Sequence, residues 1–480
     1  MTQTKAMTQT DAFAADPAAR PWFFCGIGGS GMLPLALILL GAGARVAGSD
    51  RSRDQGRSPE KFAWLESLGM TLHPQDGSGI VSSNQILVAS AAIEDTVPEV
   101  VAARALGATR LSRADVLAAL FNRAPRPIAV AGTSGKSTVT GMIGWILTKT
   151  GRDPTIVNGA VMKNFVAADA PFAAARVGTG ADFVAEVDES DGSIALYRPI
   201  VGVLGNVSLD HKSLDELREL FGDFLARSGA VAINADDAES MALAHRARAV
   251  LPFGMGAAAV IAADPASIRH SATGIAATVI NRRTGATHDL HLGVPGRHNL
   301  MNALAALAAA DLAGVPLADA VAALGSFAGL ARRFDIVGTS ASGVTVIDDF
   351  GHNPEKVAAT LATLRSHPGR VIALFQPHGY GPLRQMGDEL ATVLATRLDS
   401  ADHVILTDPV YFGGTVDRTI GSERIVDLIN AAGGHALHMP ARADAADAII
   451  AMARPGDRVV VMGARDDTLA VYARDILARV

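Results

Sequence analysis

Short apolar runs bounded by glycine or polar residues recur along the chain, and stretches with helical spacing of apolar residues separate them. Such a run predicts a buried strand, and its regular alternation with helices predicts α/β domains built on open, mainly parallel sheets. The runs predicted to carry strands lie within 22–50, 85–90, 128–131, 182–196, 201–213, 229–234, 344–350, 371–377, 403–409 and 458–464. Helical spacing is clear at 138–147 and 296–315.

The length of 480 residues exceeds one ordinary core and indicates about three domains. We predict a flexible tail over 1–20, an N-terminal Rossmann-like domain over 21–124, a central P-loop ATPase-like α/β domain over 125–327 and a C-terminal Rossmann-like domain over 328–480. The first linker is predicted at 122–127 (NRAPRP), where prolines and arginines precede a strand.

Composition narrows the class of protein. Hydrophobic residues make up 49% and the net charge is −6 without a dominant basic tract, so nucleic-acid binding is not favoured. Cys25 is the single cysteine, which rules out an intramolecular disulfide. The apolar stretch at 32–40 is too short to cross a bilayer, and the first twenty residues lack the apolar core of a signal peptide. We therefore expect a cytoplasmic protein without membrane insertion.

The segment 132–138 reads GTSGKST and lies between a predicted strand and a predicted helix. In that position backbone N–H groups and the positive helix end favour an anion, Lys136 can neutralise a terminal phosphate, and the Ser137 hydroxyl can reach a metal. The common phosphate-loop pattern has a further glycine where this chain has Val130, so the loop is a shortened form. The alternative is a glycine-rich turn with an incidental Lys-Ser pair.

A second glycine loop lies near the N-terminus. Gly26, Gly28 and Gly31 form G-x-G-x-x-G between an apolar strand and an apolar helix, and Asp50 closes the next strand. Three interpretations remain open on these residues: a dinucleotide site, a site for another nucleotide diphosphate, and a tight packing turn.

Polar residues also follow two strands of the central segment. Glu186 and His211 both come after apolar runs, so in a parallel sheet both lie at the carboxyl edge where the phosphate loop opens. With Ser137 they could hold the divalent metal that phosphoryl transfer needs. The alternatives are a solvated loop charge for Glu186 and a polar loop residue for His211.

The chain resembles the Mur ligases, the ATP-dependent amide-bond-forming family of peptidoglycan synthesis. The motifs that carry the resemblance occur in the family's order over nearly the whole chain. They are GIGGSGM (26–32), GSD (48–50), ASAAIEDTVPEV (89–100), GTSGKST (132–138), EVDESD (186–191), NVSLDH (206–211), GRHNLMN (296–302), RRFD (332–335), DDFGHNP (348–354), FQPH (375–378) and PGDRVVVMGARD (455–466).

The resemblance implies an ATP and magnesium site. Lys136 would bind the β- and γ-phosphates, Asn299 and Asn302 would meet the adenine, and Asp349 would meet the ribose. Arg333 would reach the phosphates, although the adjacent Arg332 leaves the register uncertain. The implied catalytic residues are Lys136, Glu186, His211 and Arg333, and the implied metal ligands are Ser137, Glu186 and His211. The implied ATP-binding residues are Gly132, Thr133, Ser134, Gly135, Lys136, Ser137, Thr138, Asn206, Asn299, Asn302, Arg333 and Asp349.

The resemblance also implies the reaction. ATP would phosphorylate the carboxylate of UDP-N-acetylmuramate, and the amine of an amino acid, most simply L-alanine, would attack the acyl phosphate. The N-terminal glycine loop would then hold a UDP-sugar rather than NAD. The implied substrate-binding residues are Gly28, Gly29, Ser30, Gly31, Met32, Ser49, Asp50, Ser90, His352, His378 and Arg384.

Several positions depart from the family's pattern. Gly379 and Pro382 stand where arginines are expected for anionic substrate groups, and Arg384 is the candidate to compensate. Phe350 and Asn353 replace a usual tyrosine and histidine, and the phenylalanine is shared with the related ligase that recycles murein tripeptide. Serine replaces a usual histidine at 134. Two alternatives therefore remain: a divergent Mur-type ligase with a peptide or different acceptor, and a non-catalytic ATP-binding paralogue.

Overall fold

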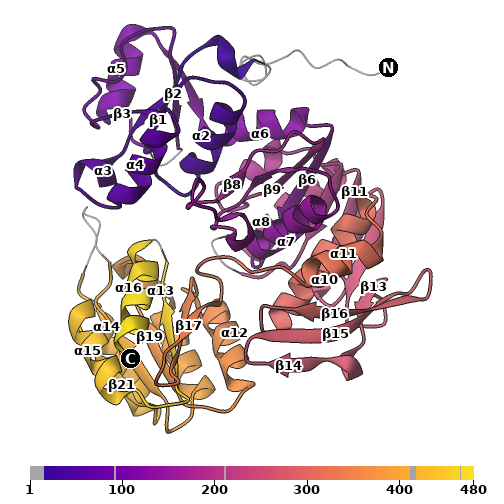
Figure 1. Cartoon of the computed structure of the whole chain (residues 1–480), viewed down its shortest axis with the longest axis vertical. Coiled ribbons are helices and arrows are strands. Elements are labelled where there is room, and N and C mark those ends of the chain that lie inside the picture. Colours follow the sequence, from indigo (N-terminus) through magenta and orange to yellow (C-terminus); the bar gives the residue numbers. More distant parts are fainter. Residues whose placement is uncertain (1–15, 91–92, 210–211, 411–417, 465) are drawn as a thin grey trace. The chain divides into compact units, whose positions relative to one another are not determined.

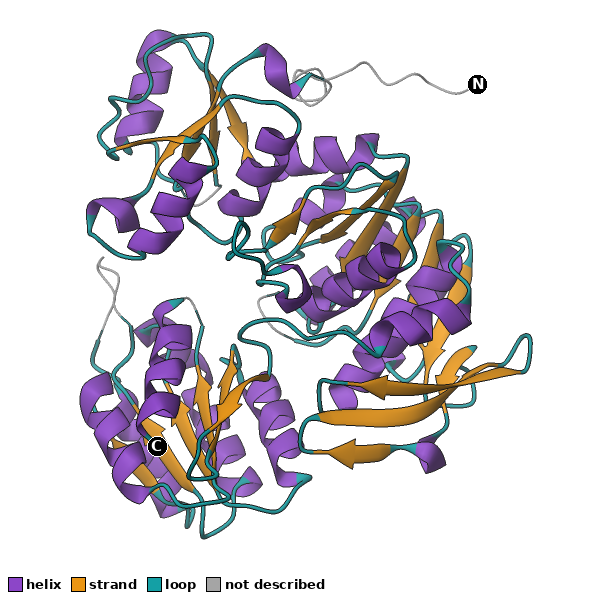
Figure 2. Ribbon diagram, viewed as in Figure 1, coloured by secondary structure: helices purple, strands orange, loops and turns teal. Residues whose placement is uncertain are grey.

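The computed structural model describes residues 16–90, 93–209, 212–410, 418–464 and 466–480. The chain forms two compact units, and each is described by itself. The first comprises 1–264, 279–288 and 302–324, and the second comprises 265–278, 289–301 and 325–480. Figure 1 labels the elements, and Figure 2 shows helices and strands alternating through both units.

The first sheet has five parallel strands in the order β3-β2-β1-β4-β5. Side chains of β1 alternate between its faces: Trp22 and Phe24 join one apolar cluster, and Phe23 and Cys25 join another. Both faces are therefore covered, as a doubly wound sheet requires. The strands are β1 Trp22–Cys25, β2 Val46–Ser49, β3 Thr71–His73, β4 Ile86–Ala89 and β5 Thr109–Ser112, and the helices are α2 Met32–Gly41, α3 Arg51–Asp54, α4 Pro59–Ser67, α5 Pro98–Leu106 and α6 Arg113–Arg123.

The second sheet has eleven strands, and its path runs β14-β15-β13-β12-β11-β10-β6-β9-β7-β8, with β16 paired to β15. The strands from β12 to β7 on this path are parallel. The strands are β6 Arg126–Ala131, β7 Thr155–Val157, β8 Ala175–Arg176, β9 Asp182–Glu186, β10 Val201–Leu204, β11 Ala230–Asn234, β12 Val250–Gly254, β13 Ile261–Ala263, β14 Arg269–Ser271, β15 Gly274–Asn281 and β16 Ala286–Leu292. The helices are α7 Lys136–Lys149, α8 Leu214–Arg227, α9 Ala238–Ala242, α10 Arg297–Leu312 and α11 Leu317–Leu324.

The third sheet has six strands in the order β17-β18-β22-β19-β20-β21, and only its edge strand β17 is antiparallel. Two separate apolar clusters cover its faces. The strands are β17 Asp335–Thr339, β18 Thr345–Asp349, β19 Val371–Phe375, β20 His403–Leu406, β21 Ala436–His438 and β22 Arg458–Met462, and the helices are α12 Pro354–Arg365, α13 Tyr380–Arg397, α14 Ser422–Ala431, α15 Arg442–Met452 and α16 Thr468–Arg479.

The predicted α/β class is confirmed by these three sheets. Residues 16–20 of the predicted flexible tail pack on the first sheet: Trp22 Nε1 donates to the Pro17 carbonyl, and Arg20 donates to the Asn84 carbonyl at 2.7 Å. The predicted linker 122–127 is largely regular structure, because its ends belong to α6 and β6. The exact domain boundaries stay a prediction.

None of the described helices is long and apolar enough to cross a membrane.

Candidate nucleotide and substrate sites

The phosphate-loop segment follows β6 and leads into α7, at the carboxyl edge of the second sheet. Strands β9 and β10 flank β6 in parallel, with Val130 opposite Glu186 and Ala131 opposite Leu204. The residues that follow β10 and end β9 therefore meet the loop, as the parallel arrangement predicted.

Asn206 braces the first half of the loop. Its backbone carbonyl accepts the Thr133 N–H at 3.1 Å, and its side-chain Oδ1 accepts the Ser134 N–H at 2.8 Å. Gly132 has φ +132° and Gly135 has φ +85°, values that glycine adopts readily and other residues do not. The backbone of the loop is therefore fixed by Asn206, a residue that the family resemblance assigns to ATP binding.

Helix α7 begins directly after Gly135, and no described side chain caps it. The first N–H groups of a helix have no intrahelical acceptor, so this end offers donors to an anion. Asn302 lies against the same turn, since a Cβ placed on Gly135 would come 2.5 Å from its Oδ1. Asn299, by contrast, belongs to the second unit and donates to the Pro295 carbonyl at 2.7 Å.

Lys136 is bound to the loop and to a carboxylate that the sequence analysis did not select. Its Nζ donates to the Gly132 carbonyl at 2.8 Å and to the two carboxylate oxygens of Glu189 at 2.8 and 3.1 Å. Glu189 is only 5% exposed, and burial raises its pKa against the opposing effect of Lys136. The only sequence signal for it was its place in the acidic run 186–191.

Ser137 and Glu186 form a pair of oxygen donors beside the loop. The Ser137 hydroxyl donates to Glu186 Oε2 at 2.7 Å, and Asn158 Nδ2 donates to the Ser137 carbonyl at 2.9 Å. A Cβ on Gly159 would overlap Glu186 Oε1, so this glycine leaves the carboxylate its space. Hard oxygen donors in this arrangement fit Mg²⁺, which binds few protein ligands and completes its shell with phosphate and water.

His211, the third predicted metal ligand, lies outside the described residues. Among the residues that are described, no group of three or more His, Cys, Asp or Glu side chains is placed to hold a metal.

The N-terminal glycine loop is shaped by Asp50. One carboxylate oxygen accepts the Gly28 N–H and the other accepts the Ser52 N–H, both at 2.8 Å. Both oxygens thus fix backbone, which differs from the ribose-binding acid of the dinucleotide interpretation. Gly29 and Ser30 are exposed, Met32 is in the core and Ser90 is half-buried.

Ser49, another predicted substrate residue, donates its hydroxyl to Glu99 Oε1 at 2.8 Å. Arg113 connects this loop to the acidic loop after β9. A Cβ on Gly31 would lie 3.1 Å from Arg113 Cδ, and Arg113 approaches Asp191 at 3.4 Å. One guanidinium therefore lies beside both candidate sites of the first unit.

In the second unit the structure distinguishes the adjacent arginines. Arg332 is buried, has φ +61° and donates to the carbonyls of Gly463 at 2.7 Å and Asp466 at 2.9 Å. Arg333 lies over the Phe350 ring, 4.4 Å from its centroid. Arg332 is thus committed to structure, whereas Arg333 packs on an aromatic ring, so the two adjacent arginines have different surroundings.

Asp349 is buried and braces the same turn. Its Oδ1 accepts the Phe334 N–H at 3.0 Å, and its Oδ2 accepts the Thr360 hydroxyl. In this structure both oxygens therefore serve the protein rather than facing an open ribose site.

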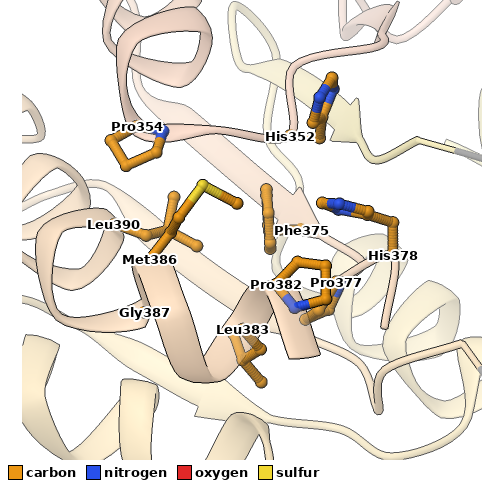
Figure 3. A pocket seen from close by; sticks show the side chains of 10 residues that line it. All are labelled: His352, Pro354, Phe375, Pro377, His378, Pro382, Leu383, Met386, Gly387 and Leu390. Atoms are coloured by element: carbon orange, nitrogen blue, oxygen red, sulfur yellow. The ribbon is translucent and has the colours of Figure 1, made fainter. Parts of the chain in front are cut away.

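A small pocket lies between the loop after β18 and helix α13 (Figure 3). The His352 and His378 rings pack edge to face with centroids 5.0 Å apart, and burial lowers the pKa of His352 to about 3. The lining is otherwise apolar and comprises Pro354, Phe375, Pro377, Pro382, Leu383, Met386, Gly387 and Leu390.

Arg384, the candidate to compensate for the missing arginines, is not among the residues that line this pocket. The pocket residues of α13 recur with helical spacing at 382, 383, 386, 387 and 390, so they share one face. Arg384 lies one position beyond Leu383, about 100° further round the helix, and its side chain is exposed.

Three family models match the chain in sequence order. They are the Mur ligase family catalytic domain over 23–124, the Mur ligase middle domain over 130–310 and the Mur ligase glutamate ligase domain over 332–465. Together they span all three sheets.

Curated relatives of similar sequence point to the same family. The UDP-N-acetylmuramate–L-alanine ligase of Streptomyces avermitilis is 36% identical, with 93% of this chain and 94% of the relative covered. That of Cereibacter sphaeroides is 36% identical, with 96% of each chain covered.

Solved structures show the same fold. A UDP-N-acetylmuramate–alanine ligase from Thermotoga maritima matches with a TM-score of 0.79 and 25% identity over 96% of this chain and 99% of that one. A murein peptide ligase from Psychrobacter arcticus matches with a TM-score of 0.68 and 25% identity over 96% and 98%. The resemblance drawn from the motifs is confirmed, and the chain belongs to the Mur ligase family of ATP-dependent, amide-bond-forming ligases.

Proposed function

We propose that this chain joins an amino acid, most simply L-alanine, to the carboxylate of UDP-N-acetylmuramate with consumption of ATP. The observation that carries the proposal is the phosphate loop with Lys136 and the adjacent Ser137–Glu186 oxygen pair. The relatives named for this reaction match over almost their whole length, which supports the substrate assignment. Such a reaction uses ATP and a UDP-sugar, in keeping with the expected cytoplasmic location.

The loop residues would bind and orient the triphosphate. The uncapped N–H groups of α7 would donate to the β- and γ-phosphates, and Lys136 would offset their charge. Magnesium, held by Ser137 and Glu186, would neutralise charge on the transferred phosphoryl group. Asn302 lies beside the loop where it can contact the nucleotide. Arg333 and Asp349, which the family motifs assign to the nucleotide, are proposed to contact its phosphates and its ribose.

The chemical steps balance without another reactant. A carboxylate oxygen of the sugar attacks the γ-phosphorus, and the bond to the ADP oxygen breaks. The amine of the amino acid then attacks the acyl carbon, phosphate leaves, and the nitrogen loses a proton. The N-terminal glycine loop around Gly28 and Gly31 is proposed to hold the UDP moiety, with Arg113 beside Gly31.

A second candidate is ligation of a peptide in place of a single amino acid. The apolar pocket of the second unit favours it, because Pro382 lines the position where an arginine is expected for a small anionic acceptor. The fold is also shared with a murein peptide ligase.

Phosphate release from ATP tests both candidates. Purified protein is given UDP-N-acetylmuramate with L-alanine, glycine, L-serine or the murein tripeptide, and products are identified by mass spectrometry. We expect release that requires both the UDP-sugar and L-alanine, with a product that contains their amide. Phosphate release with the tripeptide, but with none of the single amino acids, would favour the second candidate. No phosphate release with any acceptor would refute both candidates.

A further inference from the structure

Every donor of the Lys136 ammonium group has an acceptor within the protein. An ammonium group has three N–H donors, and here the acceptors are the Gly132 carbonyl and the two carboxylate oxygens of Glu189, at 2.8, 2.8 and 3.1 Å. A phosphate that reaches this lysine must therefore take the place of at least one of these acceptors.

Of these acceptors, Glu189 opposes the binding of a phosphate most strongly, because it carries a negative charge. It is 5% exposed, so its charge is poorly screened by water, and its contact with Lys136 offsets that charge. Glu186 ends the preceding strand, and Asp188 and Asp191 lie in the same loop as Glu189, which makes this side of the site strongly acidic. A polyphosphate arriving here meets a carboxylate that competes for the same cation.

We propose that Glu189 is a positioning residue that holds Lys136 as an anionic stand-in for the β- and γ-phosphates, so that nucleotide binds by anion exchange. The inference rests on the proposed function, which supplies the nucleotide. As a consequence, the native carboxylate orders the phosphate loop but lowers its affinity for nucleotide. Removal of the charge without loss of shape therefore strengthens nucleotide binding.

The matched substitutions are Glu189→Gln, which keeps the shape, and Asp191→Asn, which removes the same charge from the same loop but contacts Arg113 instead of Lys136. Affinities of the full-length chain for a non-hydrolysable ATP analogue, ADP and AMP are measured by calorimetry at constant magnesium and ionic strength. We expect Glu189→Gln to bind the analogue and ADP on the order of 10-fold more tightly than the native chain. AMP affinity stays unchanged, because AMP lacks the phosphates that reach Lys136.

Glu189→Asp gives a second measurement if the glutamine variant does not fold. Its carboxylate is shorter by one methylene, so its hold on Lys136 weakens and we expect a smaller gain in affinity for the analogue. Asp191→Asn leaves all three affinities at the native values. Thermal melting of each variant reports separately on a purely structural contribution.

The outcomes separate this inference from the proposed function. Equal or weaker binding of the analogue by Glu189→Gln, or a gain that AMP shares, overturns the inference while native ligation of L-alanine upholds the function. Absence of nucleotide binding in the native chain and in every variant overturns both.

Discussion

Gly159 offers a test of the Ser137–Glu186 pair as a magnesium site without removal of either side chain. A Cβ on Gly159 would overlap Glu186 Oε1 and lie 3.1 Å from its Cδ. Comfortable non-bonded contacts are near 3.5 Å, so the carboxylate must retreat by roughly 1 Å. The backbone itself tolerates alanine, because the φ of Gly159 lies outside the left-handed region.

That retreat is large for magnesium, whose oxygen ligands are held at about 2.0–2.1 Å with near-ideal octahedral geometry. We expect Gly159→Ala to raise the magnesium concentration needed for half-maximal phosphate release by about 10- to 100-fold, as perturbed ligand orientation does elsewhere. Phosphate release at fixed ATP and varied magnesium measures this, and thermal melting checks the fold.

Gly205→Ala is the matched control at the same sheet edge. Its Cβ would be 3.7 Å from the Ser134 carbonyl oxygen, which is ordinary contact, so its magnesium dependence is expected to stay native. An unaltered magnesium dependence in Gly159→Ala would show that Glu186 does not hold the metal from the position described.

Other substitutions test the remaining assignments. Lys136→Ala is expected to lower phosphate release by about 10²-fold or more and to lower the melting temperature by leaving Glu189 buried and unpaired; addition of Glu189→Gln should restore melting but not activity. Pro382→Arg is expected to lower the KM for L-alanine without a change in the KM for ATP, whereas Arg384→Ala changes neither; an altered KM for L-alanine in Arg384→Ala would mean that the pocket is not the acceptor site. The pKa of His352 falls from 6.5 to about 3 on folding, so its stabilising contribution is complete above pH 6.5 and is lost as the pH falls towards 3. His352→Asn should flatten the pH dependence of the free energy of unfolding in that window, measured by urea denaturation, and an unchanged slope would contradict the assignment.

The fold could be predicted where short sequence patterns determine the secondary structure. Runs such as 201–204 and 458–462 are apolar throughout because both faces of their sheets are covered, and the glycine loops mark where those strands end. The antiparallel strands β15 and β16 gave no such signal. Residues 274–281 alternate between buried and half-buried positions, and 286–292 include polar residues on an exposed face, so neither reads as a continuous apolar strand.

Some residues of the candidate site could likewise be predicted from the sequence, and others could not. The positions of Lys136, Ser137 and Glu186 follow from the loop motif and from the order of the strands, and both can be read from the amino-acid sequence. Glu189 could not be chosen in advance, because three other carboxylates share its run and only side-chain packing selects the one that meets Lys136. The division of Arg332 from Arg333 likewise depends on which side chain the turn at 332–334 buries, and that turn has positive φ at Arg332 and Phe334.

Helical phase decides which residues of α13 line the pocket of the second unit. By distance along the sequence alone, the arginine at 384 could replace the arginine that the family pattern has at 382. On a helix the replacement must come from the same face, and in α13 the positions near that face are Leu383, Met386, Gly387 and Leu390, none of which carries charge. The polar residues among those that line this pocket are His352 and His378. The low pKa keeps His352 neutral at physiological pH, so it can offer a hydrogen bond but not a full positive charge. As the proposed acceptor site, such a pocket would favour acceptors recognised by shape and apolar contact over those recognised by ion pairing. The acceptor panel, rather than the nucleotide site, therefore decides between an amino acid and a peptide.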